Sequence, residues 1–340
     1  MVSTERSLIT IDTAALRANV RRLREALEGA ELWAVVKADG YGHGAADVAR
    51  LALEEGASAV CVATVGEAVA LRKEVREARI LVLGPTAPDE LRRAREARLE
   101  LTVVEGPLPE GLPLHVKVDT GMGRWGMTEP VETSPDVVGL MSHLASADAD
   151  PGFTELQIER FAAIAARHPA LTRHLANSAG ILRYPAARFD AGRAGIALYG
   201  LSPFGGDPAE DRLNPVLAWR SSLREVKLLQ PGESTGYGRR FVATARTWIG
   251  LVPVGYADGW RRDLTDAEVL VGGRRCPVVG VVSMDAFAVA LPGRLETGTP
   301  VTLIGDGLLA EELARAAGTI TYELVCKIDS APERAVRHLI

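Results

Sequence analysis

The chain has 340 residues, 47% of them hydrophobic and 24% charged, which is typical of a globular protein and not of a disordered one. Its 44 acidic side chains outnumber the 39 lysines and arginines, and the net charge of −5 argues against a nucleic-acid-binding protein, which normally has a basic patch. Cys61, Cys276 and Cys326 lack the spacing of a metal site and suit a reducing cytoplasm. Neither a signal peptide nor a membrane span is evident, so we expect a cytoplasmic protein without a bound metal.

The first two thirds of the chain alternate between short apolar runs and segments with helical spacing. Ser7–Asp12 alternates like a strand, and a helix is expected over Thr13–Leu27. Eight further runs are expected to form strands: Leu32–Lys37, Ala59–Ala63, Arg79–Leu83, Leu101–Val104, His115–Val118, Val137–His143, Thr172–Asn177 and Ala194–Gly200. Helices are expected between several of them: Gly44–Glu55, Val65–Glu77, Pro88–Arg98 and Phe153–His168. This alternation predicts an α/β fold, a (β/α)8 TIM-like barrel over residues 11–210.

Two connections in this barrel are too short for a normal crossover helix. About ten residues, Glu105 to Leu114, join the fourth and fifth strands, and Arg124 to Pro135 provides a short polar link before the sixth. A crossover that includes a helix needs about a dozen residues or more. We therefore expect the helices after strands four and five to be shortened or absent. In the helix over Phe153–His168, we expect Leu156, Phe161, Ile164 and Ala165 to share the buried face.

After about residue 210 the helical spacing disappears and short valine-rich runs lie between glycine, proline and aspartate turns. The expected strands are Val226–Leu229, Trp248–Val254, Glu268–Val271, Pro277–Val282, Ala286–Leu291 and Val301–Ile304. One helix is expected over Gly307–Ala317. Residues 211–340 are therefore predicted to form a mainly β domain, joined by the strand within residues 1–10.

Lys37 is the first candidate for covalent chemistry. Only five of the chain's basic residues are lysines, against 34 arginines, and Lys37 lies between an apolar run and a glycine-rich turn. An amine that must lose its proton and attack a carbonyl cannot be replaced by a guanidinium. A lysine that merely extends from a strand end into water is the alternative explanation.

Other polar residues follow the ends of the predicted strands, where the active sites of such barrels lie. These residues are Lys117, Asp119, Arg124, His143, Asn177, Ser178, Arg193, Gly195 and Ile196. Taken singly, Ser178 could be a helix cap and Lys117 an ion-pair partner of Asp119. Taken together, a reactive lysine and a phosphate site after strands seven and eight favour pyridoxal 5′-phosphate (PLP) as a Schiff-base cofactor.

Six segments of the sequence resemble motifs of the alanine racemases, in the order of that family. They are Ala34-Val35-Val36-Lys37-Ala38-Asp39-Gly40-Tyr41-Gly42-His43-Gly44, Asp119-Thr120-Gly121-Met122-Gly123-Arg124, Ser142-His143-Leu144-Ala145, Ala176-Asn177-Ser178, Arg193-Ala194-Gly195-Ile196-Ala197-Leu198-Tyr199-Gly200 and Val254-Gly255-Tyr256-Ala257-Asp258-Gly259. The resemblance extends from about residue 7 to residue 328. It implies a PLP-dependent isomerase that interconverts L-alanine and D-alanine and supplies D-alanine for peptidoglycan.

The resemblance also implies a role for each matching residue. Lys37 would bind PLP and act as one base, and Tyr256 would be the opposing base, provided by the second subunit of a homodimer. Arg193 would bond the pyridine nitrogen of PLP, and His143 would link Arg193 towards Tyr256. Further contacts to the cofactor would come from Tyr41, Ser178, Gly195 and Ile196. Arg124 and the backbone N–H of Met284 would contact the substrate. Lys117 matches a position that is carbamylated in some members of the family.

The sequence departs from the family near its C-terminus. Ser330-Ala331-Pro332-Glu333-Arg334 replaces an Arg-Val-Pro-Arg-like run, and Ser330 stands where some relatives have an entrance tyrosine. A racemase for serine or larger amino acids is therefore one alternative. A PLP-dependent decarboxylase is another, although such enzymes favour an acidic partner for the ring nitrogen where this chain has Arg193. A non-catalytic PLP carrier is a third, but such carriers are single barrels without the domain that contains Tyr256.

Overall fold

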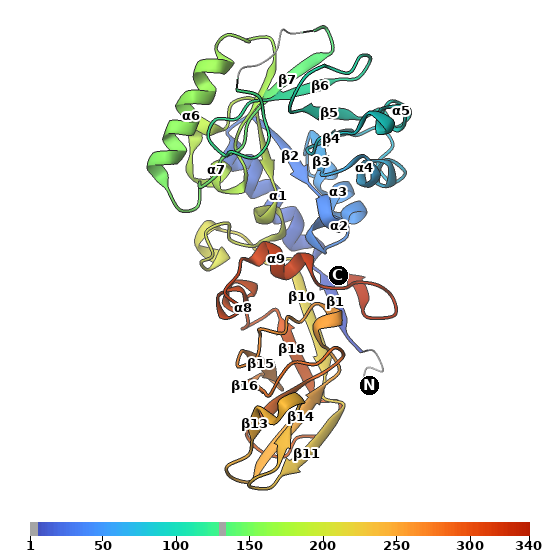
Figure 1. The fold of residues 1–340 in the computed structure, drawn as a ribbon, viewed down its shortest axis with the longest axis vertical. Helices are drawn as coiled ribbons and strands as arrows, with labels where there is room; N and C mark the ends of the chain where they lie inside the picture. The colour runs from blue at the N-terminus through green and yellow to red at the C-terminus, as the bar shows by residue number, and fades with distance from the viewer. Residues whose placement is uncertain (1–5, 129–133) are drawn as a thin grey trace. The chain divides into compact units, whose positions relative to one another are not determined.

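The structure is a computed structural model that describes residues 6–128 and 134–340 (Figure 1). The chain divides into two compact units. One unit comprises Ala15–Asn214, and the other combines the residues up to Ala14 with Pro215–Ile340. Within the described residues, no helix is both long and apolar enough to cross a membrane.

The Ala15–Asn214 unit is a closed barrel of eight parallel strands, which confirms the predicted fold class (Figure 1). Its strands are β2 (Glu31–Val35), β3 (Ala59–Val62), β4 (Arg79–Val82), β5 (Glu100–Val103), β6 (Leu114–Lys117), β7 (Val137–Met141), β8 (Thr172–His174) and β9 (Ala191–Ala194). Its α-helices are α1 (Thr13–Leu27), α2 (Lys37–Tyr41), α3 (Ala45–Glu54), α4 (Val65–Arg72), α5 (Leu91–Glu96), α6 (Pro151–Ala165) and α7 (Ser178–Arg183). Closure comes from β2, which pairs in parallel with both β3 and β9.

In their described residues, the connections after the fourth and fifth barrel strands contain no helix, as predicted. No helix lies between β5 and β6, over residues 104–113. Between β6 and β7, residues 118–128 and 134–136 contain none either, and the rest of the Arg124–Pro135 link lies outside the described residues.

The eighth predicted strand is misplaced. Strand β9 covers Ala191–Ala194, whereas Ile196–Tyr199, within the predicted run, form a 3-10 turn. The small residues of β9 gave no apolar signal, but they are required for packing. A Cβ placed on Gly192 would lie 2.7 Å from side-chain atoms of Ile181 and Leu27. The strand is therefore built from residues that let two helices approach it closely.

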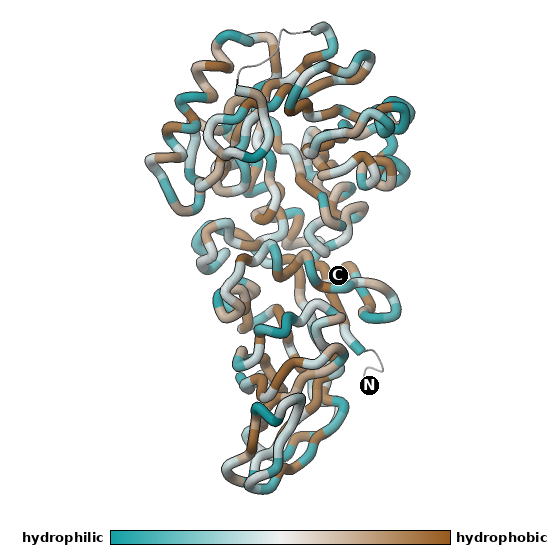
Figure 2. The backbone as a smooth tube through the Cα atoms, viewed as in Figure 1, coloured by the Kyte–Doolittle hydropathy of each residue, from teal (hydrophilic) through white to brown (hydrophobic). Residues whose placement is uncertain are grey.

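The buried face of α6 also differs from the prediction. Phe161 and Ala165 are buried, but Leu156 is exposed, and Gln157 is buried in its place. The Gln157 side chain is fully used: its Oε1 accepts from the Ala145 N–H at 2.8 Å, and its Nε2 donates to the His143 carbonyl at 3.1 Å. Polar contacts to the end of β7 therefore set the rotation of this helix. In Figure 2, hydrophilic and hydrophobic residues alternate along α6.

The second unit is mainly β, again as predicted. Its nine-stranded sheet has the order β11-β14-β17-β16-β15-β18-β10-β1-β19. The strands are β1 (Leu8–Ile11), β10 (Leu217–Ser222), β11 (Glu225–Leu229), β14 (Thr247–Val252), β15 (Glu268–Val271), β16 (Arg274–Val279), β17 (Phe287–Leu291), β18 (Pro300–Ile304) and β19 (Val336–Leu339). A separate pair joins β12 (Ser234–Thr235) to β13 (Phe241–Val242), and two helices follow, α8 (Ala310–Ala316) and α9 (Thr321–Cys326).

The two ends of the chain meet in this sheet. Strand β1 pairs antiparallel with β10 and parallel with β19. Beside them, the indole of Trp260 stacks on Phe287 with ring centroids 5.1 Å apart. Trp219 packs against Trp260, and its indole N–H donates to Ser7 Oγ at 2.7 Å. An aromatic core, in which the Trp219 indole is hydrogen-bonded to Ser7, therefore anchors residues that lie just before β1.

Candidate active site

Lys37 opens a turn with an unusual backbone. The three residues after it, Ala38, Asp39 and Gly40, have φ values of 52°, 49° and 61°, and Tyr41 follows with 54°. Left-handed backbone costs a non-glycine residue about 1–2 kcal/mol, so the surroundings must hold this turn in place. The Ala38 N–H donates to Glu67 Oε1 at 2.8 Å, and Asp39 Oδ1 accepts from the Ala45 N–H at 2.9 Å. Such over-determined strain is typical of functional sites.

Tyr41, Ser178 and Gly195 meet at one side of the barrel mouth. The buried Ser178 Oγ accepts from the Gly195 N–H at 3.0 Å and from the Ala197 N–H at 3.3 Å. A Cβ placed on Gly195 would lie 2.6 Å from the Tyr41 hydroxyl, so only glycine leaves room there. Ser178 is not the cap of α7, because the Asn177 side chain accepts from the Gly180 N–H. Two hydroxyls and backbone N–H groups therefore converge around a glycine, as in a phosphate cradle.

Arg193 is buried beneath this mouth, where three strands hold its guanidinium. Its Nη1 donates to the carbonyl of His174 at 2.8 Å and to His174 Nδ1 at 2.7 Å. Its Nη2 donates to the Ser142 carbonyl at 2.7 Å and to His143 Nδ1 at 3.2 Å. Within the described residues Nε makes no hydrogen bond, and it is not sealed from solvent. One N–H donor on a rigidly held cation is therefore available to a ligand.

A chain of buried side chains extends inward from Arg193, and its direction follows from the donors. Because guanidinium only donates, His174 Nδ1 accepts, and its Nε2–H must donate to His115 Nδ1, 2.8 Å away. The His115 Nε2–H then donates to Glu100 Oε2 at 2.9 Å. Both imidazoles are therefore neutral, each with its proton on Nε2, between a buried cation and a carboxylate.

The pKa shifts along this chain agree with that assignment. Burial lowers the pKa of His174 well below its ordinary value, and burial, only partly opposed by Glu100, lowers the pKa of His115. Burial alone would raise the pKa of Glu100, but hydrogen bonds from His115 and Arg79 outweigh it and lower that pKa to about 2. Burial lowers the pKa of Arg193 to about 10, so Arg193 is a cation at neutral pH.

Lys117 lies buried at the end of β6 in a positive environment. Burial, followed by the charges of Arg124 and Arg193, lowers its pKa to about 8. Its Nζ lies 5.8 Å from the centroid of the Trp125 ring, and the Arg124 guanidinium lies 5.3 Å from the same ring. No ion pair joins Lys117 to Asp119 in the described part of the chain, because the Asp119 carboxylate accepts the N–H groups of the next turn. Part of the Lys117 population therefore has a neutral amine near physiological pH.

His143 continues the polar chain on the other side of Arg193. Its Nδ1 accepts from Arg193, so the proton of the neutral ring is on Nε2. Burial, with the charges of Arg193 and Lys117, lowers the pKa of His143 well below its ordinary value. The ring is therefore a neutral donor that Arg193 orients.

Tyr256 and Met284 belong to the β unit and lie side by side. Tyr256 begins the 3-10 turn Tyr256–Asp258, and its N–H donates to the Ser283 carbonyl at 3.1 Å. Their side chains are 44% and 51% exposed, and the Met284 N–H makes no hydrogen bond within the described residues. Tyr256 also lines a cavity of about 700 Å³ in which basic and acidic side chains are mixed: Arg240, Arg261, Arg262 and Lys327 with Asp263, Asp266 and Glu323.

The structure thus brings the predicted residues together in two groups. The barrel unit holds Lys37, Tyr41, Lys117, Arg124, His143, Ser178, Arg193, Gly195 and Ile196, and the β unit holds Tyr256 and Met284. Sequence reasoning missed His115, His174, Glu100 and Gln157. Residues two positions apart in a strand share a face, so His115 lies on the same face as Lys117. The expectation that Lys117 points into the barrel could therefore have identified His115 as a site residue. His174 and Gln157 gave no comparable signal.

Comparisons with known proteins agree along the whole chain. Residues 11–203 match the family model described as alanine racemase, N-terminal domain, and residues 216–336 match alanine racemase, C-terminal domain. The alanine racemase of Symbiobacterium thermophilum is 42% identical over 94% of this chain and 93% of its own length. That of Geobacillus stearothermophilus is 40% identical over 96% and 93%.

Solved structures give the same result. The alanine racemase from E. faecalis has a TM-score of 0.91 at 36% identity and covers 100% of both chains. The one from Streptomyces coelicolor A3(2) has a TM-score of 0.89 at 39% identity, with 98% of each chain covered. With both domain models matched and relatives near 40% identity along almost its full length, this chain belongs to the alanine racemase family.

Proposed function

We propose that this protein is an isomerase that interconverts L-alanine and D-alanine, with PLP as its cofactor, and that its D-alanine supplies peptidoglycan synthesis in the cytoplasm. The observation that carries this proposal is the barrel mouth itself. Lys37, on a strained turn, lies just after β2, and β2 pairs with the strand that carries a buried arginine, which keeps one N–H for a ligand; a hydroxyl-lined glycine cradle follows that same strand. The solved alanine racemase of Bacillus anthracis, 33% identical, has bound L-Ala-P.

The residues of the mouth fit PLP by the chemistry of their donors. Tyr41, Ser178, Gly195 and Ile196 would hold its phosphate, and Arg193 Nε would donate to its ring nitrogen. Once bound, PLP supplies the electron sink that makes the α-proton of an amino acid acidic. A guanidinium does not give up its proton, so Arg193 would leave the ring nitrogen unprotonated, which separates this site from a decarboxylase with an acidic partner.

The proton transfers would be divided between two side chains of this protein. Lys37 Nζ would take or return the α-proton on one face of the substrate, and the Tyr256 hydroxyl would do so on the other. Two bases on opposite faces allow inversion without any movement of the substrate. His143, as an Nε2–H donor fixed by Arg193, would hydrogen-bond the phenol oxygen. Arg124 and the Met284 N–H would hold the substrate carboxylate.

Gly195→Ala tests the cradle. The added methyl group would lie 2.6 Å from the Tyr41 hydroxyl, and such overpacking costs about 1–3 kcal/mol. We expect PLP to bind about tenfold more weakly, as measured by titration of the apoprotein. Gly293→Ala is the matched control, since a Cβ there meets nothing within 4 Å. Unchanged PLP affinity in Gly195→Ala would remove Gly195 from the cofactor site.

Lys117 is proposed to be carbamylated. The Lys117 ammonium first loses one proton; the neutral amine then attacks carbon dioxide, forms a C–N bond as one C=O π bond opens, and releases a second proton, so that a cation becomes an anion beside Arg124. Because the Lys117 pKa is about 8, the neutral form and the carbamate both increase as pH rises through 8 and decline below it. With ¹³C-labelled bicarbonate we expect a carbamate resonance at pH 9 that weakens at pH 6. It should be absent in Lys117→Met, and a wild-type protein without it at pH 9 is not carbamylated.

Two subunits are proposed to share each site, with Tyr256 of the partner subunit facing Lys37. The exposure of Tyr256 and Met284 supports this arrangement. Lys37→Ala and Tyr256→Ala homodimers should each be inactive. After subunit exchange, half of the dimers are mixed and have one intact site each, so about a quarter of wild-type activity should return. Proven exchange without recovery would mean that the site is not shared.

Chiral analysis of products tests the function as a whole. L-alanine should give a mixture that approaches equal amounts of both enantiomers, and it should be compared with L-serine and larger amino acids. Ser330 replaces the entrance tyrosine of some relatives, and a smaller side chain there would admit larger substrates. Faster turnover of serine than of alanine would therefore favour a racemase for serine or larger amino acids. Loss of carbon dioxide from the substrate would identify a decarboxylase instead.

A further inference from the structure

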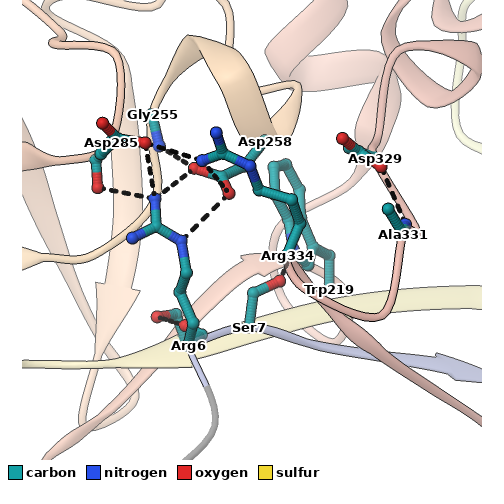
Figure 3. Close-up of polar contacts among 10 residues, drawn as sticks. Arg6, Ser7, Trp219, Gly255, Asp258, Asp285, Asp329, Ala331 and Arg334 are labelled. Atoms are coloured by element: carbon teal, nitrogen blue, oxygen red, sulfur yellow. Dashed lines mark hydrogen bonds and ion pairs between the residues drawn. The ribbon is translucent and has the colours of Figure 1, made fainter.

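A cluster of four charged residues lies beside the turn that bears Tyr256. Arg6 Nη2 donates to Asp258 Oδ2 at 2.8 Å and to the Asp285 carbonyl at 2.9 Å. Arg334 Nη1 donates to Asp285 Oδ1 at 2.7 Å and lies 3.4 Å from Asp258 Oδ1. Figure 3 shows both guanidinium groups pointing at the two carboxylates. We call Arg6, Arg334, Asp258 and Asp285 the Asp258 cluster.

The centre of the Asp258 cluster is shielded from water. The Asp258 side chain is 1% exposed, whereas both arginines are 30% exposed. A carboxylate at such a depth needs partners for every oxygen, and Asp258 has them, since Oδ2 also accepts from the Gly255 N–H at 2.8 Å. Buried ion pairs of this kind add little net stability compared with apolar packing. A role in holding one geometry explains the cluster better than a role in folding energy.

The geometry that the cluster holds includes both candidate site residues of this unit. Asp258 ends the turn that Tyr256 begins, and Asp285 follows Met284 directly. The two segments are in backbone contact, because the Ala257 N–H donates to the Met284 carbonyl at 3.0 Å. A Cβ on Gly255 would lie 2.4 Å from the Met284 oxygen, so the segments pack without any intervening side chain. A shift of either carboxylate would therefore move both segments.

The arginines come from the two ends of the chain. Arg6 precedes β1, and Arg334 precedes β19, the strand with which β1 pairs in parallel. Both arginines thus lie just before strands that pair with each other, and they connect the turn to the sheet. Arg334 also lies in the segment where the sequence departs from the family pattern, and there it contacts both carboxylates.

We propose that Arg6 and Arg334 are positioning residues which, through Asp258 and Asp285, fix the Tyr256 hydroxyl in the geometry that proton transfer requires. This inference rests on the function proposed above. It adds that ion pairs formed by residues near the two chain ends determine the position of Tyr256, one of the two proposed bases. A displacement of about 1 Å at a reacting group lowers rates by up to about 100-fold.

The test uses the full-length PLP-loaded protein and four variants: Arg334→Gln, Arg334→Lys, Arg6→Gln and the double variant Arg6→Gln/Arg334→Gln. The first readout is hydrogen–deuterium exchange of the backbone over residues 253–260 and 283–287. The second is the rate of α-hydrogen exchange into deuterated solvent, measured separately from L-alanine and D-alanine. Arg275→Gln is the control, because Arg275 forms ion pairs with Glu268 and Glu312 on the same unit.

We expect Arg334→Gln to increase backbone exchange in those two segments and the double variant to increase it further. The enantiomer whose proton Tyr256 removes should exchange about tenfold more slowly, while the other changes less than about threefold. Arg334→Lys should recover part of the loss, and Arg275→Gln should change neither readout. Circular dichroism and the visible cofactor band identify any variant that fails to fold.

Three results would overturn the inference. If backbone exchange is faster but the α-hydrogen exchange rates of both enantiomers fall equally, the cluster holds the fold of the turn and does not position Tyr256. Unchanged backbone exchange in the double variant would show that the cluster does not hold the turn. Equal loss of folding in all four variants, the lysine variant included, would assign the cluster to stability. A wild-type protein that does not racemise alanine contradicts the proposed function instead, and the backbone-exchange readout still tests the cluster.

Discussion

Replacing Lys37 with alanine is expected to lower the rate of alanine racemisation about 10⁴-fold, the upper end of the effect of one general base. On the function proposed above, the change would remove both the covalent link to PLP and one of the two proton acceptors. Removal of the side chain should also abolish the visible absorption band of the PLP Schiff base. Activity assays and absorption spectra of PLP-incubated protein measure both effects.

Lys37→Arg separates amine chemistry from charge. Arginine keeps the positive charge near Lys117 and His143, but it cannot form a Schiff base. We therefore expect it to be as inactive as alanine and equally colourless. Lys73→Ala, at an exposed position after α4, is the control and should keep both colour and activity. A coloured and active Lys37→Arg protein would transfer the covalent role to another residue.

The barrel could be predicted from the sequence because its signals are local. Six of its strands, β2 to β7, contain short apolar runs, and polar residues at the strand ends mark the mouth. The eighth strand was not predicted correctly because it consists mainly of small residues. Gly192 allows close packing of the strand, but such residues give no apolar pattern in the sequence. The lack of a helix in the described residues after β5 and β6 was predictable for the opposite reason, since a chain of about ten residues has no room for a crossover helix.

The interior of the site was less predictable, because its contacts join residues that are distant in the chain. The hydrogen bond from His174 to His115 spans 59 positions, and the one from Arg6 to Asp258 spans 252. No local periodicity encodes such a pair. Gln157 shows the same limit within one helix: this polar residue lies on the buried face because His143 and Ala145 after β7, and Thr120 after β6, satisfy its amide.

Tyr256→Phe is expected to slow α-hydrogen exchange from one alanine enantiomer by about 10²–10⁴-fold and to leave exchange from the other nearly unchanged. The substitution removes a single oxygen atom. Because the ring is 44% exposed, no cavity forms, and the free energy of unfolding should change by less than about 0.5 kcal/mol. Exchange into deuterated solvent, followed by mass spectrometry for each enantiomer alone, measures the two faces separately.

The asymmetry is what distinguishes a base from any other role of the ring. A tyrosine that only shapes the pocket or contacts the substrate carboxylate would affect both enantiomers alike, since both place the carboxylate in the same position. Tyr237→Phe removes a hydroxyl from a 72% exposed ring of the same unit and should leave both rates intact. If Tyr256→Phe slows both enantiomers equally and only a few-fold, inversion cannot proceed through this phenol, and the second base must be sought among other groups.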